Sequence, residues 1–573
     1  MKERLCIGLL LAAVVLVYGN SLLNRFTLDD GYYIVQNPHV TNPSVQGMFA
    51  PQTFTKVFRP VTFATFALNW KLGSGRPFGF HLFNLALHAA VTLLLYLLLQ
   101  TIFIESPPRD PSTQADSSSQ RNALVFAAAL LFAVHPLHTE AVSSIVGRSE
   151  LLAAGFLFAA WILHIRDLQI PAVICFVLAL LSKESSAVFL PLILVVDYAR
   201  GQWKPRLRYV LFAGVTLLYL GLLWKLRGDF FGQGIVASQL DNPLAAIPSQ
   251  WRVLNGLRVA WKYVALHIYP ATLSSDYSFN QIRIYLDWRH TWAAALGAMG
   301  VVGAWLWAVW KRRIGPAVAG SMYLVGFATT ANILIPIRTI MGERLAYLPS
   351  AGFCLLAALS WNWLRNRHRM AAWVALTAVA AAFGVRTIVR NQDWKDNFTL
   401  FSADVRAVPG SSRIHAELAG TYMEKQQLEM AAAEFQRSLQ IYPDNVDALS
   451  NFGLLESWKG NDQAAGQMME RALALSHRDS PDYDFMAVNL AALLMQTDHL
   501  DGALDLLNRE IDESPEYARA WSNRAVIHYK QGEPAPARSD AQQALRLEPD
   551  NRQAQNLLRV LGPADGSASQ AHP

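Results

Sequence analysis

Long apolar runs are the feature that most constrains this chain. Before about residue 390, runs of a length that lets a helix cross a bilayer, roughly 17–25 residues, recur between short polar loops. Charged residues make up 16% of the sequence, whereas soluble domains contain about 25%. After residue 390 the sequence is charged, Ala-rich and helical in pattern. We therefore predict an all-α protein with a polytopic membrane domain at 1–390 followed by a soluble helical part.

About eleven membrane spans are expected. The first, MKERLCIGLLLAAVVLVYGN, begins with basic residues but lacks a small-x-small cleavage site, so we interpret it as an uncleaved anchor. The other apolar runs lie at 79–103, 122–137, 149–165, 169–182, 185–199, 207–226, 290–310, 315–335, 345–363 and 370–387. Three of them, 122–137, 169–182 and 185–199, are short for a span. Amphipathic stretches at 59–70 and 253–270 suit helices that lie in the membrane interface.

Basic residues fall in every second loop, as expected for loops on the cytoplasmic side. With the N-terminus inside, the inward loops hold Arg109, Arg121, Arg166, Arg200, Lys204, Arg206, Arg208, Lys311, Arg312, Arg313, Arg365, Arg367 and Arg369. An odd number of spans then places everything after residue 388 outside. The net charge of +6 comes mostly from the basic residues of these inward loops. The charge therefore indicates membrane topology, and no nucleic-acid partner is expected.

A 34-residue period begins after residue 411 and predicts tetratricopeptide (TPR) repeats. Small residues recur at Ala431, Ala465, Ala503 and Ala537, and Phe435, Met469, Leu507 and Ala541 follow four residues later. We expect a connecting helix at 391–411, about four repeats with a capping helix at 412–561, and a disordered tail at 562–573. The chain would thus end in a TPR α-solenoid.

Three asparagines share one repeat position, on the first helix of three consecutive repeats. They are Asn451, Asn489 and Asn523. First helices of such arrays line the concave groove, where a carboxamide can pair with a peptide backbone. This pattern resembles the asparagine ladder of the nucleocytoplasmic O-linked N-acetylglucosamine transferase. It predicts acceptor binding, although an asparagine there can also simply bond to a neighbouring helix.

Two adjacent acids directly outside the first span are the strongest chemical signal. Asp29 and Asp30 stand in TLDDGYYIVQNP, where Gly31, Tyr32 and Tyr33 follow in a turn able to hold a sugar. A carboxylate there can act as general base on an acceptor hydroxyl. The alternative is a pair of solvated loop residues.

A second cluster lies at one membrane edge in HPLHTEAVSSIVGRSELL. It contains His135, His138, Glu140, Arg148 and Glu150, and ionisable residues at such positions are functional candidates. The histidines and Arg148 could satisfy one another or contact a phosphate. A divalent metal is conceivable, but spacing fixes no third ligand, so we do not expect a metal site.

Further charges share the predicted outer side. The pairs Lys183-Glu184 and Glu343-Arg344 each precede an apolar run, where an ion pair within the pair is one interpretation. A lipid-phosphate leaving group needs cations that stabilise its developing charge. We therefore assign donor-phosphate binding to Arg59, His135, His138, Arg148, Lys183 and Arg344, with Glu140, Glu184 and Glu343 in support.

Several blocks together resemble one known family. TLDDGYYIVQNPHV, FRPVTFATFALNW, PFGFHLFNLALHA, HPLHTEAVSSIVGRSELLA, SKESSAVFLPL and GERLAYLPSAGF are similar to blocks of the transmembrane and tetratricopeptide repeat-containing O-mannosyltransferases and their prokaryotic relatives. That family belongs to the C-type glycosyltransferase superfamily. The resemblance implies a polyprenyl-phosphate sugar donor and places Asp29 and Asp30 in the acidic catalytic motif.

The expected function is transfer of mannose or a similar hexose to Ser or Thr hydroxyls of extracytoplasmic proteins, with the TPR repeats binding the acceptor. No cofactor is expected beyond the lipid-linked donor. The short repeat array points to a prokaryotic plasma (inner) membrane, with the N-terminus cytoplasmic and the repeats periplasmic. In a eukaryote the repeats would lie in the endoplasmic-reticulum lumen. The alternatives are a non-catalytic membrane TPR scaffold for envelope assembly and a transporter of lipid-linked sugar, which should bury charges at mid-membrane.

Overall fold

The computed structural model of the chain describes residues 3–49, 57–103, 114–228, 238–333, 336–478, 480 and 482–562, without the side chains of 114–119. Throughout these residues the regular structure is helical, and the chain divides into two compact units, residues 1–414 and 415–573. The predicted all-α class is confirmed. The expected disordered tail after residue 562 lies outside the described residues.

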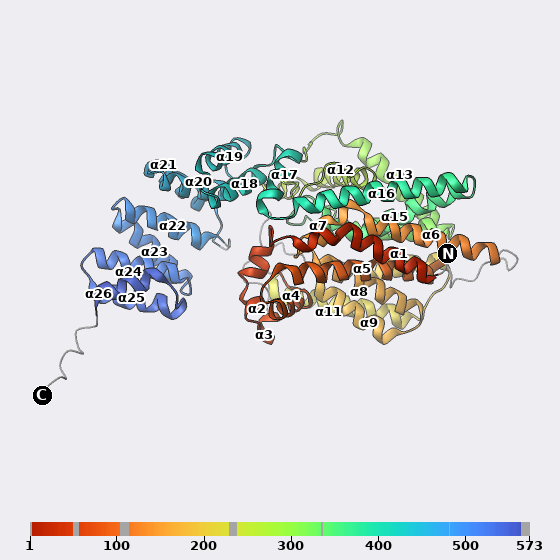
Figure 1. Cartoon of the computed structure of the whole chain (residues 1–573), viewed down its shortest axis with the longest axis horizontal. Helices are drawn as coiled ribbons and strands as arrows, with labels where there is room; N and C mark the ends of the chain where they lie inside the picture. Colours follow the sequence, from red (N-terminus) through yellow and green to blue (C-terminus); the bar gives the residue numbers. More distant parts are fainter. Residues whose placement is uncertain are drawn as a thin grey trace. The chain divides into compact units, whose positions relative to one another are not determined.

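A bundle of long helices forms the first unit (Figure 1). Its helices coincide with all the predicted apolar runs. They are α1 (Glu3–Tyr18), α5 (Pro77–Phe103), α6 (Gln114–Val134), α8 (Arg148–Ile165), α9 (Gln169–Ser182), α10 (Phe189–Arg200), α11 (Arg206–Arg227), α13 (Trp292–Trp310), α14 (Ile314–Phe327), α15 (Tyr347–Arg365) and α16 (Arg369–Asp393). The two amphipathic stretches form α4 (Pro60–Gly73) and α12 (Ser249–Ile268).

The number of helices that can cross a bilayer is smaller than predicted. Among the described residues, 7 helices are long and apolar enough, or 8 if the bent pair Gln120–Val134 and Pro136–Ser143 is one span. Of the remaining predicted spans, α9 and α14 have 14 residues each and α10 has 12. At about 1.5 Å per residue, such helices fall short of a hydrocarbon core of about 30 Å. The expectation of eleven full spans is therefore not met by helix length.

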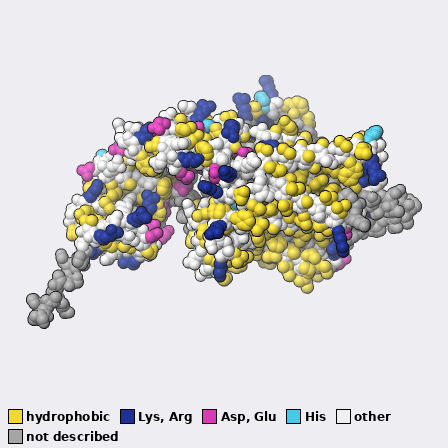
Figure 2. All heavy atoms as spheres, viewed as in Figure 1, with side chains coloured by type: hydrophobic (Ala, Val, Ile, Leu, Met, Phe, Trp, Pro, Cys, Tyr) yellow, Lys and Arg dark blue, Asp and Glu magenta, His cyan; other side chains and the backbone are white. Residues whose placement is uncertain are grey.

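The spans differ in how far the rest of the unit covers them. In the apolar stretch of α8, 78% of the residues are buried inside the structure. The buried fraction of the corresponding stretch is 17% in α11 and 6% in α13. Hydrophobic side chains spread over the outer surface of the bundle (Figure 2). Helix α8 therefore belongs to the core, while α11 and α13 present apolar faces suited to lipid.

The basic loops meet at one end of the bundle. Lys204 donates to the carbonyl of Ile165 at 3.1 Å and to Asp167 at 2.9 Å. The guanidinium of Arg312 lies 5.2 Å from the ring centroid of Tyr198. Loops that were predicted to share the cytoplasmic side thus contact one another, and which face of a membrane they occupy stays a prediction.

The other end of the bundle carries the short helices. Helices α2 (Pro38–Thr41), α3 (Val45–Met48) and α4 lie at the end opposite the N-terminus (Figure 1). The helical turns at 136–138 and 343–346 and α7 (Thr139–Ser143) precede α8 and α15. Helix α17 (Asn397–Ala407) follows α16. These segments bring together loops that are far apart in the sequence.

The second unit consists of paired helices. They are α18 (Ser412–Glu424) and α19 (Leu428–Ile441), α20 (Val446–Trp458) and α21 (Asp462–Leu475), α22 (Tyr483–Gln496) and α23 (Leu500–Glu513), and α24 (Ala518–Lys530) and α25 (Pro534–Leu547), with α26 (Arg552–Leu561) last. The small residues predicted to allow close packing, Ala431, Ala465, Ala503 and Ala537, are all fully buried. A side chain at Gly453 would meet the Ala465 carbonyl at 3.1 Å, so α20 and α21 approach closely because that residue is glycine.

Candidate active site

The two adjacent acids Asp29 and Asp30 lie in different environments. Asp30 is fully buried, and its carboxylate accepts the backbone N–H groups of Thr27 and Val146 at 3.0 Å each. Burial raises the pKa of Asp30 to about 7, while these hydrogen bonds lower it. The side chain of Asp29 is 36% exposed. Asp30 therefore ties the first loop to the segment before α8, and Asp29 faces outward.

Arg344 connects Asp29 to Glu140. Its backbone N–H and its Nη1 each donate to the buried Glu140 carboxylate at 2.8 Å. The same Nη1 lies 3.8 Å from Oδ2 of Asp29, and the Arg344 side chain is 31% exposed. A guanidinium has five N–H donors, so this arrangement leaves donors of Arg344 for a ligand beside Asp29.

Lys183 and Glu184 pair with distant residues and not with each other. Glu184 accepts from Nε and Nη2 of Arg59 at 3.1 and 2.8 Å, a bidentate pair that stays partly exposed. Burial opposes ionisation of Glu184, but the Arg59 guanidinium outweighs it and holds the pKa of Glu184 below its usual range. Lys183 forms a buried ion pair with Glu150. The Arg59–Glu184 pair thus joins the start of α4 to the turn between α9 and α10, and the Lys183–Glu150 pair joins the same turn to α8.

Arg148 is enclosed. Its guanidinium donates to Asn84 Oδ1, Thr65 Oγ1 and the Phe80 carbonyl at 2.8, 3.2 and 3.0 Å, and the residue has no exposed surface. It also lies 4.6 Å from the ring centroid of Phe83. Arg148 therefore holds α4, α5 and α8 together and offers no surface to a phosphate.

The two histidines of the same block are also fully buried. His135 accepts the N–H of Leu137 at 3.2 Å and donates to the His267 carbonyl at 3.2 Å. His138 hydrogen-bonds to the Ser350 hydroxyl at 2.6 Å. They fix the break between α6 and α7, and neither reaches the surface on which Asp29 lies.

Glu343 belongs to a network that the sequence analysis did not detect. Its Oε1 accepts from Ser274 N and Tyr277 Oη at 2.7 Å each. Nearby, Asp404 accepts from Ser275 N at 2.8 Å and lies 3.0 Å from Nη2 of Arg390. These contacts join the loop after α12 to the ends of α16 and α17. Arg390 lies just after the apolar run at 370–387 and Asp404 lies in α17, and a single charge at either position carries no signal in sequence.

The accessible part of the site is thus smaller than the predicted set. Asp29, Arg344, Arg59 and Glu184 keep exposed side-chain surface, whereas Asp30, Glu140, Glu343, Lys183, Arg148, His135 and His138 are buried. Among the described residues, no cluster of three or more His, Cys, Asp and Glu side chains could hold a metal ion. The accessible groups are thus the Asp29 carboxylate, 3.8 Å from the Arg344 guanidinium, and the partly exposed Arg59–Glu184 pair.

In the second unit, two of the three ladder asparagines face neighbouring helices. Asn489 and Asn523 are 8% and 7% exposed. Asn489 Oδ1 accepts from Arg519 at 3.4 Å, and Asn523 Nδ2 donates to the Val488 carbonyl at 3.5 Å. Asn451 is half-buried. Two of the three amides thus contact neighbouring helices, as the packing interpretation expects, and peptide binding by the ladder stays a prediction.

Fold and site together define a polytopic helical membrane protein that carries a TPR array and a charged site at one end of its membrane unit. Tetratricopeptide repeat models match residues 412–445 and 518–551, so the predicted repeats are confirmed.

Over most of its length the chain is similar to proteins named protein O-mannosyl-transferase, and the predicted family resemblance is confirmed. It is 25% identical to TMTC3 of Mus musculus, over 95% of this chain and 64% of that protein. It is 29% identical to F38B6.6 of Caenorhabditis elegans, over 72% of this chain and 59% of that protein. It is 26% identical to Tmtc3 of Drosophila melanogaster, over 83% and 59%. The chain therefore spans 59–64% of the length of these relatives.

Proposed function

We propose that this protein is a membrane glycosyltransferase. It transfers a hexose, which the names of its relatives suggest is mannose, from a polyprenyl-phosphate donor to a Ser or Thr hydroxyl of an extracytoplasmic protein. The TPR unit binds the acceptor protein. The observation that carries this proposal is the reachable carboxylate of Asp29 beside the Arg344 guanidinium, 3.8 Å away.

Asp29 is the residue of the acidic pair that suits a general base. Both carboxylate oxygens of Asp30 accept hydrogen bonds from backbone N–H groups, whereas Asp29 is partly exposed. Asp29 takes the proton of the acceptor hydroxyl while the hydroxyl oxygen attacks the anomeric carbon of the sugar. The bond from that carbon to the phosphate oxygen breaks, and the polyprenyl phosphate leaves with its electron pair and negative charge.

Arg344 and Arg59 are the cations placed to stabilise that charge. Each keeps part of its side chain exposed while an acid, Glu140 or Glu184, fixes the guanidinium plane. Charges held in position in this way stabilise a developing anion without reorganising during the reaction. Because the Asp29 carboxylate and the Arg344 guanidinium adjoin, acceptor and leaving group can occupy the same small surface.

The test is glycoproteomics of extracytoplasmic proteins from cells that lack the protein and are complemented with wild-type chain or Asp29→Asn. Asparagine keeps the size and removes the base, so hexose-modified Ser and Thr peptides should fall about a hundredfold at unchanged protein level. Asp167→Asn is the control, because Asp167 is an exposed acid at the opposite end of the unit.

Two results would contradict parts of the proposal. Transfer by Asp29→Asn at the wild-type level would remove Asp29 as the base. Identical glycopeptides with and without the wild-type chain would overturn the enzyme assignment and favour the scaffold.

A further inference from the structure

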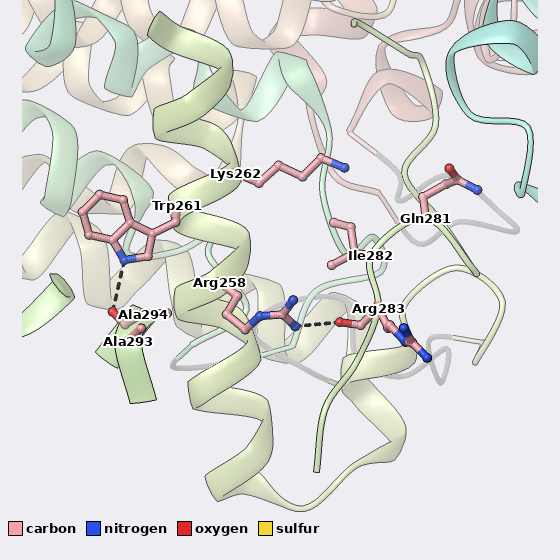
Figure 3. Close-up of a pocket in the computed structure, with 8 residues that line it drawn as sticks. All are labelled: Arg258, Trp261, Lys262, Gln281, Ile282, Arg283, Ala293 and Ala294. Atoms are coloured by element: carbon pink, nitrogen blue, oxygen red, sulfur yellow. Dashed lines mark hydrogen bonds between the residues drawn. The ribbon is translucent and has the colours of Figure 1, made fainter. Parts of the chain in front are cut away.

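A cavity of about 640 Å³ lies between α12, the segment 281–283 and the first turn of α13. Figure 3 shows its lining residues, with Arg258, Trp261 and Lys262 on α12 and Arg283 on the facing segment. None of the residues assigned to the proposed active site lines it. It is therefore a separate site on the first unit.

The lining is cationic and contains no acid. Arg258, Lys262 and Arg283 contribute three positive groups, and no carboxylate lies within ion-pair distance of them in the part of the chain that the structure describes. Burial lowers the pKa of Lys262, and the negative charge of Glu343 offsets that effect only in part. An anion in the cavity would therefore be attracted by three positive groups that form no ion pair with a carboxylate of the described residues.

Arg258 and Trp261 are held in place before any ligand arrives. Arg258 Nη1 donates to the Arg283 carbonyl at 2.6 Å, and its guanidinium lies 4.3 Å from the ring centroid of Tyr285. Trp261 Nε1 donates to the Ala294 carbonyl at 3.1 Å, which joins α12 to α13 (Figure 3). Ordered cations lose little entropy when they bind, which favours affinity.

The surroundings of the cavity are those of a membrane interface. Helix α13 starts at the cavity and is a candidate span that presents nearly its whole apolar surface outward. Close to the start of α13 in the sequence, Trp288 and Trp292 are exposed, and the ring centroid of Trp288 lies 5.5 Å from that of Trp251 on α12. Tryptophans gather where hydrocarbon meets headgroups. A molecule with a phosphate in the cavity could thus lay an acyl chain along α13.

We propose that this cavity binds the phosphate headgroup of an anionic glycerophospholipid of the surrounding bilayer, with Arg258, Lys262 and Arg283 contacting the phosphate and α13 contacting the acyl chains. The site goes beyond the proposed glycosyl transfer and does not depend on it. Helix α12 also reaches the active-site segment, because Tyr263 Oη donates to the Gly342 carbonyl at 2.8 Å. A bound lipid would therefore steady a helix that contacts the segment carrying Arg344.

The test measures lipid retained by the purified full-length chain in detergent, with native mass spectrometry, during titration with phosphatidylglycerol, phosphatidylcholine or a polyprenyl phosphate. Phosphatidylglycerol should be retained in preference to phosphatidylcholine. Loss of one cation near an anionic lipid weakens binding about fivefold, so Lys262→Gln should lower the phosphatidylglycerol affinity about fivefold and Lys262→Arg should restore it.

A second pair of variants tests the same cavity without replacing Lys262, so its result does not depend on whether the Lys262 variants fold. Ala293 is exposed on the rim of the cavity, so Ala293→Glu adds a negative charge where the phosphate would lie, and Ala293→Gln adds the same bulk without charge. Only the glutamate should abolish preferential retention of phosphatidylglycerol. Lys225→Gln, an exposed cation at the end of α11, controls for general loss of positive charge.

Equal retention by wild-type chain, Lys262→Gln and Ala293→Glu would overturn the proposal. So would an equal loss in Lys225→Gln, because the effect would then reflect net charge alone. Retention that responds to the variants only for the polyprenyl phosphate would also overturn it, since the cavity would then be a donor site.

Discussion

At the residue scale, neighbours in sequence have unlike roles. Asp29 is partly exposed, whereas Asp30 is buried. Lys183 and Glu184 form ion pairs with different partners. The side chain of Glu343 accepts from Tyr277, whereas Arg344 pairs with Glu140. Successive side chains in a tight turn point in different directions. One residue of each pair therefore packs into the unit while the other remains at its surface.

Asp30 should act through stability. In Asp30→Asn one oxygen can still accept an N–H, but the amide nitrogen cannot replace the other acceptor. One buried N–H, of Thr27 or Val146, then loses its partner at a cost of about 1–3 kcal/mol. Thermal unfolding in detergent at pH 5 should show a lower Tm for the variant, whereas Asp29→Asn should unfold like wild type. Equal Tm values for Asp30→Asn and wild type would contradict the role of Asp30 in holding the first loop against the segment before α8.

The same carboxyl should make stability depend on pH. Its folded-state pKa of about 7 lies above an unfolded value of about 3.9, so between these values the folded chain binds more protons. The stability contributed by protonated Asp30 is complete below pH of about 4 and is lost as the pH rises through about 7. Asparagine does not titrate, so the Tm difference between wild type and Asp30→Asn should shrink from pH 5 to pH 8. A difference that stays constant would show that Asp30 does not titrate in this range.

Two arginines of the predicted phosphate set should respond differently to lysine. Lysine keeps the charge but cannot reproduce the planar fork. Arg148→Lys leaves buried acceptors on Asn84 and Phe80 unpaired and should lower the free energy of unfolding by about 2 kcal/mol. Arg344→Lys should leave stability nearly unchanged and weaken use of the polyprenyl-phosphate donor. Donor kinetics of the purified variants, beside their unfolding curves, separate these outcomes, and the reverse pattern would contradict the assignment.

At the element scale, breaks between helices build the candidate site. The chain bends by 50° between the helical segments Gln120–Val134 and Pro136–Ser143, where His135 caps the turn and Pro136 cannot continue a helix. That break carries Glu140 to Arg344, and the turn after α9 carries Glu184 to Arg59. Short helices thus supply the charged groups, and long helices supply the frame that holds them.

The packing of α22 and α24 also predicts the role of the ladder asparagines. Because Asn489 and Asn523 are nearly buried between these helices, replacing both with alanine should lower stability by about 1 kcal/mol each. Circular dichroism of the full chain during thermal unfolding measures this loss, and Gln531→Ala, an exposed amide, is the control. An unchanged Tm together with weaker acceptor-peptide binding would restore the peptide-binding interpretation.

At the scale of the whole molecule, the number of spans decides where the repeats lie. Seven or eleven crossings from a cytoplasmic N-terminus place the TPR unit outside, and eight place it inside. The predicted outer location requires that protease added to sealed right-side-out vesicles remove the segment after residue 390. Opened vesicles are the control. Protection until the membrane is opened would mean an even number of crossings, with the bent segment between α6 and α7 as a full span.

The sequence by itself determined the features that depend on local pattern. Runs of apolar residues located the long helices of the first unit other than α12, which an amphipathic stretch indicated, and the 34-residue period located the four helix pairs of the second. Both signals repeat along the chain, because a bilayer imposes a length and a solenoid imposes a period. Blocks such as TLDDGYYIVQNP also marked the segments that meet at the site.

Only the tertiary structure decided which charges meet and which remain accessible. Arg344 and Glu140 are 204 residues apart and Arg59 and Glu184 are 125 apart, and no local pattern encodes such pairings. Burial likewise depends on what packs above a residue, so the sequence could not distinguish the enclosed Arg148 from the exposed Arg344. The sequence already marked the runs of α9 and α10 as short for a span, whereas α14 ends at Phe327 in a turn that apolar content alone did not reveal. Partner choice and accessibility are properties of the assembled bundle, because each requires contacts between segments that only folding brings together.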